Sequence, residues 1–242
     1  MRVLVTRPAE DASRTAETLA KLGHAALIAP LLEIHFLDGP EISLAGVQAI
    51  LATSGNGIRA LVRRSSRRDI PVFAVGTQTA NLARAEGYLE IVDAAGDSRA
   101  LADVVRGRLR PDAGVLLHAA GTHSRNEWRE RLRSAGFEVR RSVLYEAGEA
   151  QELPPAAQIA LRSGSIDALI VFSPRSARIL ADCVERASLA SACGCVTACC
   201  ISDEAAEALR SIPFAAIRVA AHPDHDAVLA LLDSCAKHGE RS

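Results

Sequence analysis

The chain has 242 residues, of which 49% are hydrophobic and 3% aromatic, and its formal net charge is -1. This length allows one large α/β domain or two small ones. The lack of a basic excess argues against a nucleic-acid or membrane-surface role. No apolar run reaches the roughly 20 residues of a membrane span. The N-terminus lacks a signal-peptide pattern, so the sequence predicts a cytoplasmic protein with reduced cysteines.

Strand-length apolar runs alternate with helical patterns along the whole chain. The first strand is expected over 3–6, and the first helix over 11–22, where every third or fourth residue is apolar or small. Strand–helix alternation of this kind predicts parallel sheets covered by helices on both faces. Further strands are expected at 25–29, 47–53, 72–75, 89–92, 114–118, 167–172, 196–201 and 217–220.

The strand–helix pattern repeats within the chain. The strand–helix–strand segment that starts at Arg2 resembles the one that starts at Gly114, and the segments that follow each of them also match. We therefore expect two similar lobes, each with a five-stranded sheet of flavodoxin-like size. The repeat leaves the pairing of the four segments open. If the extended segments 30–36 and 140–148 lie side by side as a two-stranded linker, the N-terminal segment joins the C-terminal one around a middle lobe.

Hydroxyl-bearing turns precede several expected helices. Ser54, Ser173 and Ser202 are placed as helix N-caps, and 124–127 has the form of a capping box. Ligands of parallel sheets bind beyond the carboxyl ends of the strands, where helix N-termini offer free amides to anions. The loops there are rich in hydroxyls and glycine, which predicts a small ligand with several negative groups. These loops are 6–8, 53–56, 76–79, 118–124, 173–175 and 202–203.

Sharper motifs are weak in this sequence. TSGNG at 53–57 resembles a phosphate loop, but no lysine follows it, and neither a dinucleotide fingerprint nor a nucleophile elbow occurs. The cysteine cluster at 193–200 lacks zinc-site spacing, and we interpret Cys199 and Cys200 as small core hydrophobes. We interpret His222 and His225 as loop residues and the basic run 63–68 as a solvated loop. No metal is expected.

Six short motifs occur in the order found in uroporphyrinogen-III synthases, and the resemblance covers the whole chain. They are VLVTRP, PLLEI, ATSGNGI, AVGTQTA, VLYE and ALIVFSPRSA. The resemblance implies two flavodoxin-like α/β parallel-sheet lobes joined by a two-stranded linker, with a cleft between them. Residues 1–34 plus 149–242 would form the first lobe and 39–140 the second, with linkers at about 30–38 and 141–148.

The resemblance also implies an activity. Members of the family act on hydroxymethylbilane, a linear tetrapyrrole that carries acetate and propionate side chains. They remove its hydroxyl group as water and close the ring with inversion of the last pyrrole, in haem and sirohaem biosynthesis, without a cofactor. The chain would then be a cyclising hydro-lyase and a monomer, with neither nucleic-acid nor membrane partners. A two-lobed small-molecule-binding protein without catalysis is the alternative.

Carried over residue by residue, the resemblance makes Tyr145 the catalytic group. A phenol, with an ordinary pKa of about 10, is protonated at neutral pH and can donate to the leaving hydroxyl. Packing at the hinge is the alternative role of this side chain. At one loop the chain departs from the family, because two acids follow Ser202 where many members have G-x-T-T-A. The implied substrate-binding residues are Thr6, Arg7, Ser54, Asn56, Gly76, Thr77, Thr79, Ser173 and Ser202.

Overall fold

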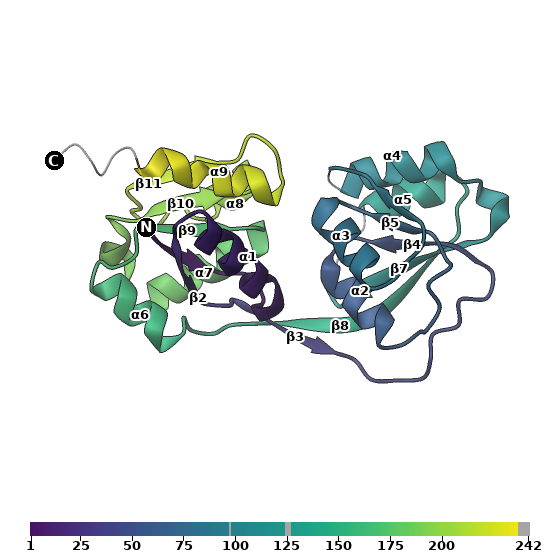
Figure 1. The fold of residues 1–242 in the computed structure, drawn as a ribbon, viewed down its shortest axis with the longest axis horizontal. Helices are drawn as coiled ribbons and strands as arrows, with labels where there is room; N and C mark the ends of the chain where they lie inside the picture. The colour runs from purple at the N-terminus through teal and green to yellow at the C-terminus, as the bar shows by residue number, and fades with distance from the viewer. Residues whose placement is uncertain (97, 124–126, 237–242) are drawn as a thin grey trace. The chain divides into compact units, whose positions relative to one another are not determined.

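The computed structural model describes residues 1–96, 98–123 and 127–236 (Figure 1). The chain divides into two compact units, Met1–Glu33 with Gly148–Ser242 and Ile34–Ala147. We call the first unit the discontinuous lobe and the second the inserted lobe. Each lobe contains one sheet covered by helices, so the α/β class predicted from the alternating pattern is confirmed. No helix in the described part of the chain is long and apolar enough to cross a membrane.

The discontinuous lobe has a five-stranded parallel sheet in the order β11-β10-β9-β1-β2. Read from its other edge, this is the 2-1-3-4-5 order of flavodoxin-like folds. The central neighbours β1 and β9 pair from Val3 with Ala168 to Val5 with Ile170, so the N-terminal segment shares its sheet with the C-terminal part. The strands are β1 (Arg2–Val5), β2 (Ala25–Ile28), β9 (Ala168–Val171), β10 (Thr197–Cys200) and β11 (Ala216–Val219).

Helices cover both faces of this sheet because its strands are apolar on both sides. Val3 and Val5 pack with residues of α1 and α9, whereas Leu4 packs with residues of α6 and α7. Helix α1 begins two residues earlier than the sequence predicts, and Leu22, expected on its apolar face, is 51% exposed beyond its end. The helices are α1 (Ala9–Lys21), α6 (Pro155–Arg162), α7 (Pro174–Arg186), α8 (Asp203–Glu207) and α9 (His225–Ala236), with the 3-10 turn η2 (Ala190–Cys193).

The inserted lobe has six strands in the order β3-β8-β7-β4-β5-β6. Counted from β7, five of them repeat the 2-1-3-4-5 order, and β3 is an additional strand beside β8. The sequence predicts five strands here and a two-stranded linker of segments 30–36 and 140–148; the structure has β3 beside β8 at the edge of the inserted sheet. The strands are β3 (Leu32–Phe36), β4 (Val47–Ala52), β5 (Val72–Ala74), β6 (Ile91–Asp93), β7 (Val115–Gly121) and β8 (Val139–Glu149).

Two helices pack on each face of the inserted sheet (Figure 1). Residues of α2 and α3 share a core with Ile50 and Leu117, and residues of α4 and α5 share a core with Leu51 and Leu116. Neighbouring residues of one strand thus face opposite helix pairs, as the alternation of a strand requires. The helices are α2 (Gly55–Val62), α3 (Thr77–Ala85), α4 (Ser98–Arg108) and α5 (Glu127–Ser134), with the 3-10 turn η1 (Pro111–Ala113).

The basic run at 63–68 forms a loop after α2, as the sequence predicts, and Arg63 and Arg67 are exposed, but two of its other arginines bind the backbone. Arg64 donates to the backbone carbonyls of Leu37 at 2.9 Å and Pro40 at 2.8 Å. Arg68 donates to the carbonyls of Ser65 at 2.7 Å and of Glu86 at 2.9 Å. These carbonyls belong to connecting segments outside the strands, where the guanidinium groups supply hydrogen bonds that the backbone needs.

Candidate active site

Each sheet has one point where its strand order reverses, between β1 and β9 in the discontinuous lobe and between β4 and β7 in the inserted lobe. Ligands of open α/β sheets bind outside the carboxyl ends of the strands at such points. Arg7 and Ser173 closely follow β1 and β9, and Ser54 closely follows β4. Several of the predicted substrate-binding residues therefore lie at the reversal point of their own lobe.

Ser54 forms the start of α2, as the sequence predicts. Its backbone is extended, with φ -157° and ψ 157°, and its Oγ accepts a hydrogen bond from the N–H of Gly57 at 3.4 Å. Gly57 has no room for a side chain, because a Cβ there would lie 2.5 Å from the carbonyl oxygen of Ala119 in β7. The glycine at position 57 in TSGNG therefore permits the close approach of α2 to β7.

Tyr145 lies beside this helix start. Its hydroxyl is 2.9 Å from the Oγ of Ser54, and its carbonyl accepts a hydrogen bond from the N–H of Thr122 at 3.0 Å. The ring packs on Gly121, where a Cβ would lie only 2.7 Å from the Cε2 atom of Tyr145. The register of β7 and β8 shifts at Gly121, which stands opposite Tyr145. Backbone pairing, ring packing and the serine hydroxyl together fix the phenol at the amino end of α2.

The other predicted residues of the inserted lobe differ in their surroundings. The Oδ1 of Asn56 accepts from Arg59 at 2.8 Å. Gly76 is the N-cap of α3, and its carbonyl accepts from the N–H of Ala80 at 3.0 Å. Thr77 is exposed at the first position of α3, whereas Thr79 is 7% exposed in the same helix. Thr77 therefore offers the more accessible hydroxyl of the two threonines.

His118 is buried behind this site. The sequence predicts that a loop starts at His118, but β7 continues to Gly121; residues 124–126 of the expected loop and capping box lie outside the described residues. The Nε2 of His118 is 3.3 Å from the Oγ1 of Thr53, and its ring meets Trp128 edge-on at 4.8 Å. Burial, with smaller contributions from Arg129 and Arg141, lowers the pKa of His118 to about 3, so the imidazole is neutral at physiological pH.

Three predicted hydroxyls of the discontinuous lobe hold the fold together. The Oγ1 of Thr6 donates to the carbonyl of Ile170 at 2.9 Å and joins β1 to β9. Ser173 caps α7 by accepting from the N–H of Ser176 at 3.0 Å, and Ser202 caps α8. Both N-caps confirm the sequence prediction. Because Thr6 is only 1% exposed, its hydroxyl faces the interior of the lobe.

Arg7 belongs to an aromatic cluster that the sequence did not indicate. Its guanidinium lies 4.5 Å from the ring centroid of Phe172 and 3.3 Å from the Oδ2 of Asp11. The Phe172 ring also stacks on His225, with centroids 5.4 Å apart and planes at 16°. His225, predicted as a loop residue, begins α9, and burial lowers the pKa of its imidazole although Asp226 opposes this. Nothing in the spacing of Arg7, Phe172 and His225 reveals this cluster, because the fold alone brings them together.

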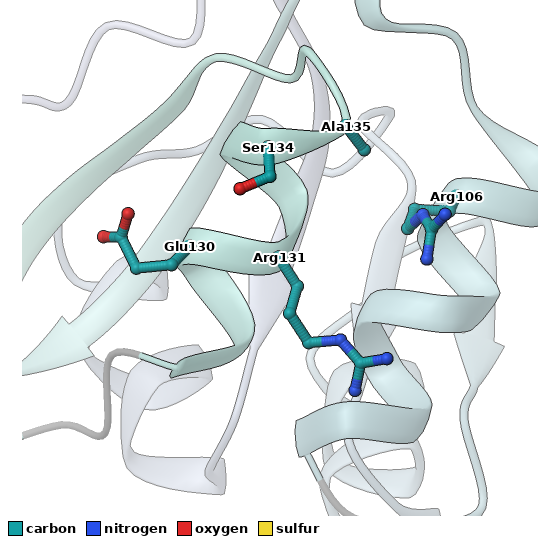
Figure 2. A pocket seen from close by; sticks show the side chains of 5 residues that line it. All are labelled: Arg106, Glu130, Arg131, Ser134 and Ala135. Atoms are coloured by element: carbon teal, nitrogen blue, oxygen red, sulfur yellow. The ribbon is translucent and has the colours of Figure 1, made fainter.

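A separate hollow of about 370 Å³ lies between α4 and α5 (Figure 2). It contains none of the predicted site residues, and its charged groups are exposed. Arg106 and Arg131 both lie 3.7 Å from the Oδ1 of Asp103. The hollow is lined by Arg106, Glu130, Arg131, Ser134 and Ala135.

The cysteine cluster has the structural role that the sequence predicts for Cys199 and Cys200. Both residues are buried in β10, and burial raises the pKa of Cys200 to about 12 and that of the nearby Cys193 to about 11. These thiols are therefore protonated at neutral pH. Within the described ranges, no three His, Cys, Asp or Glu side chains gather as a metal site.

Comparisons with known proteins show the fold and, separately, the family. A search of curated proteins finds no significant match. The structure resembles that of uroporphyrinogen-III synthetase from Helicobacter pylori, with TM-score 0.63, 18% identity, 97% of this chain and 99% of that chain covered. It also resembles that of a mutant uroporphyrinogen III synthase from Thermus thermophilus, with TM-score 0.54, 17% identity and coverage of 98% and 99%. These likenesses show the fold.

The family itself is shown by the sequence. The family described as uroporphyrinogen-III synthase HemD matches residues 13–230. The match includes the reversal point of the inserted lobe with Ser54 and Tyr145, as well as Phe172 and His225. Because the match spans most of the sequence, the chain belongs to the uroporphyrinogen-III synthase family.

Proposed function

We propose that the chain closes hydroxymethylbilane to uroporphyrinogen III and that Tyr145 is the catalytic residue that donates the proton lost with the hydroxyl group. The observation that carries this proposal is the 2.9 Å contact between the hydroxyls of Tyr145 and Ser54 at the amino end of α2, in a member of this family. Hydroxide is a poor leaving group, so cleavage of the carbon–oxygen bond needs a proton donor. General-acid assistance of this kind contributes about 10²–10⁴ in rate.

The hydrogen-bond order at Ser54 favours donation from Tyr145. The Oγ of Ser54 accepts from the N–H of Gly57, and the same hydroxyl can donate to the phenol oxygen. When Ser54 is the donor, the phenol proton points away from Ser54, and we propose that it is transferred to the substrate hydroxyl. Hydrogen bonds in such a series polarise one another, and the positive amino end of α2 favours the negative charge that develops on the phenol oxygen.

Arg7 is our proposed group for a substrate carboxylate. Its guanidinium is held by Phe172 and Asp11, so little side-chain freedom is lost when it binds an anion. The substrate carboxylate has to compete with Asp11, which limits the binding energy at this point. Thr77 and the cap residues Ser173 and Ser202 are further proposed contacts, as are Asn56, Thr79 and Gly76. Thr6 is not among them, because its buried hydroxyl donates to the carbonyl of Ile170. The acids Asp203 and Glu204 beside Ser202 disfavour an anion in that loop.

The product isomer depends on steering as well as on proton transfer. The bilane closes spontaneously to the uninverted isomer, so the protein has to hold a conformation in which the inverted closure is faster. The proposal includes a cyclising hydro-lyase reaction that needs no cofactor, a monomeric enzyme and a cytoplasmic location. The small tetrapyrrole is the proposed ligand, and nucleic acid is not.

The test is isomer analysis of the product. The protein is incubated with enzymatically generated hydroxymethylbilane, and the oxidised porphyrins are separated by isomer. We expect the type III isomer in an amount that rises with protein concentration, whereas buffer alone gives type I. Production of type I alone would refute the proposal. Saturable binding of the bilane without type III product would instead favour the non-catalytic two-lobed binding protein, which gains no support from the family match.

A further inference from the structure

We propose that Arg141 is a positioning residue that holds the loop on which the Tyr145 ring rests. Arg141 lies in β8, four residues before Tyr145, and its side chain reaches the end of β7. Its Nη2 donates to the carbonyl of Gly121 at 2.6 Å and to that of Thr122 at 2.8 Å. The catalytic consequence of this contact rests on the proposed role of Tyr145.

The peptide that links Gly121 and Thr122 is bound from two directions. The N–H of Thr122 donates to the carbonyl of Tyr145 at 3.0 Å, while the carbonyls on either side of it accept from Arg141. Hydrogen bonds from an ionised donor are about twice as strong as neutral ones. The backbone therefore cannot move away from Tyr145 without losing contacts to both residues of β8.

Gly121 transmits this restraint to the phenol. The Tyr145 ring lies so close to Gly121 that a Cβ there would be 2.7 Å from Cε2 and 3.1 Å from the hydroxyl oxygen. The ring thus uses the glycine backbone as its support. Displacement of that backbone by a fraction of the ring's thickness would let the hydroxyl leave its 2.9 Å contact with Ser54.

The positive charge of Arg141 is electrostatically unfavourable where it lies, because other basic groups are near. Burial is the first cause of the lowered pKa of Arg129, and the charge of Arg141 is the second. The same two guanidinium groups also oppose protonation of His118. Like charges that influence one another in a partly buried region are unfavourable. A neutral side chain at 141 would avoid this repulsion but could not bind both carbonyls.

Arg140 is a matched control on the same strand. It has the same guanidinium group, and its Nη2 donates to the carbonyl of Ser43 at 2.7 Å. This carbonyl precedes β4 and belongs to neither the Gly121 loop nor α2. Arg140→Met and Arg141→Met both remove a guanidinium from β8 together with its hydrogen bond to a backbone carbonyl. Only Arg141→Met also removes the hydrogen bond to Gly121.

The experiment uses the full chain labelled with 3-fluorotyrosine. The chain has two tyrosines, Tyr88 and Tyr145, so the fluorine NMR spectrum contains two assignable signals, and Tyr88→Phe identifies them. We expect Arg141→Met to shift or broaden the Tyr145 signal and to leave the Tyr88 signal in place. Arg140→Met should leave both signals unchanged. An unchanged Tyr145 signal in Arg141→Met would overturn the proposal, whatever the activity of the protein.

Kinetics give the second readout. We expect Arg141→Met to lower kcat for the type III isomer by about 10- to 100-fold, the effect of misplacing a catalytic group by about 1 Å, with KM nearly unchanged. A raised KM with unchanged kcat would instead mean that Arg141 binds a substrate carboxylate directly, and would overturn the positioning role. If Arg141→Met does not fold, Arg141→Lys is used instead, because lysine keeps the charge and can reach one carbonyl. A wild-type kcat in Arg141→Lys together with a displaced Tyr145 signal would overturn the positioning role.

Failure of the proposed function is distinguishable from failure of this inference. If the unaltered chain makes only the type I isomer, the proposed function fails, and the fluorine signals alone decide whether Arg141 positions Tyr145. If the unaltered chain makes type III while both arginine variants match it in kcat and spectrum, only the positioning role fails.

Discussion

The sheets of the two lobes have the same strand order, but different side chains lie at the point where that order reverses. In the inserted lobe, the hydroxyls of Ser54 and Tyr145 meet at 2.9 Å beside β4 and β7. In the discontinuous lobe, Arg7 lies on Phe172 and pairs with Asp11 beside β1 and β9. The repeat aligns Glu33 with Glu146, and therefore Leu32 with Tyr145. One duplicated scaffold thus carries a phenol at the reversal point of one copy and a guanidinium at that of the other.

The largest expected effect is the loss of the phenol hydroxyl. We expect Tyr145→Phe to lower kcat for the type III isomer by about 10²–10⁴ while the fold is kept, because only the proposed proton donor is removed. Isomer-resolved steady-state kinetics measure the change, and circular dichroism checks the fold. Tyr88→Phe is the matched control, since the Tyr88 hydroxyl is buried without a hydrogen-bond partner among the described residues. An unchanged kcat in Tyr145→Phe would show that Tyr145 is not the proton donor and that the inserted lobe does not supply this group.

Gly121→Ala tests the support under the phenol. A methyl group at this position meets the Tyr145 ring at 2.7 Å, so the ring has to move. We expect kcat to fall by about 10- to 100-fold, as for other displacements of a catalytic group by about 1 Å. Gly107→Ala in α4 is the control, because its added Cβ meets no described atom within 4 Å beyond its chain neighbours and its own helix backbone. Equal kcat values for the two variants would show that the ring position does not limit the reaction.

The buried histidine of the inserted lobe gives a pH-dependent prediction. His118 has a pKa of about 3 in the folded chain and an ordinary value of 6.5, so between these values the unfolded chain binds the additional proton. The unfolding free energy therefore falls as pH drops below about 6.5, and this contribution stops changing below about pH 3. Between pH of about 6.5 and 4.5 we expect a loss of about 2–3 kcal/mol from this group alone.

Urea denaturation at several pH values measures this contribution. His118→Gln should flatten the dependence in that range, whereas His123→Gln, which removes an exposed imidazole, should leave it as in the unaltered chain. His225→Gln provides the comparison with the other lobe, because burial also lowers the pKa of His225. A slope that His118→Gln does not change would show that the buried imidazole is not the group that destabilises the lobe in acid.

The smallest expected effects compare the two serine caps directly. Ser54 and Ser173 each cap a helix at the reversal point of their own lobe, so either alanine substitution should lower the unfolding free energy by about 1 kcal/mol. Only Ser54 also contacts Tyr145, and we expect only Ser54→Ala to lower kcat, by about 5- to 10-fold. Equal kcat losses in Ser54→Ala and Ser173→Ala would contradict the division of chemistry between the lobes.

Local patterns were sufficient to predict the elements but not all of their partners. Strand β1 and the caps at Ser54 and Ser173 follow from apolar runs and turn residues a few positions apart. The segment of β3 was predicted to lie beside 140–148 as part of a linker, but not as a sixth strand of the inserted sheet, because its partner β8 lies more than a hundred residues later in the chain. The length of β7 was underestimated because Ala119 and Ala120 have little strand propensity of their own.

The sequence predicted those residues of the candidate site that lie in one local turn, but not the contacts between distant residues. Ser54 stands out in the sequence as a cap, and the family resemblance pointed to Tyr145, but the two residues are 91 positions apart and their contact depends on the register shift at Gly121. Phe172 was predicted only as the end of a strand and His225 as a loop residue. Their stacking arises because α9 packs on β9, which no spacing in the sequence encodes.

The pairing of β1 with β9 has a consequence for synthesis on the ribosome. Val3 and Ala168 are partners, so the N-terminal strand leaves the ribosome long before its neighbour is made. The inserted lobe, in contrast, is one continuous segment from Ile34 to Ala147, and only the outer ends of β3 and β8 extend beyond it. We expect it to fold first, since domains generally fold as units during synthesis. Until β9 is made, β1 has only β2 as a strand partner, so we expect chaperones to bind the nascent chain at this part of the discontinuous lobe.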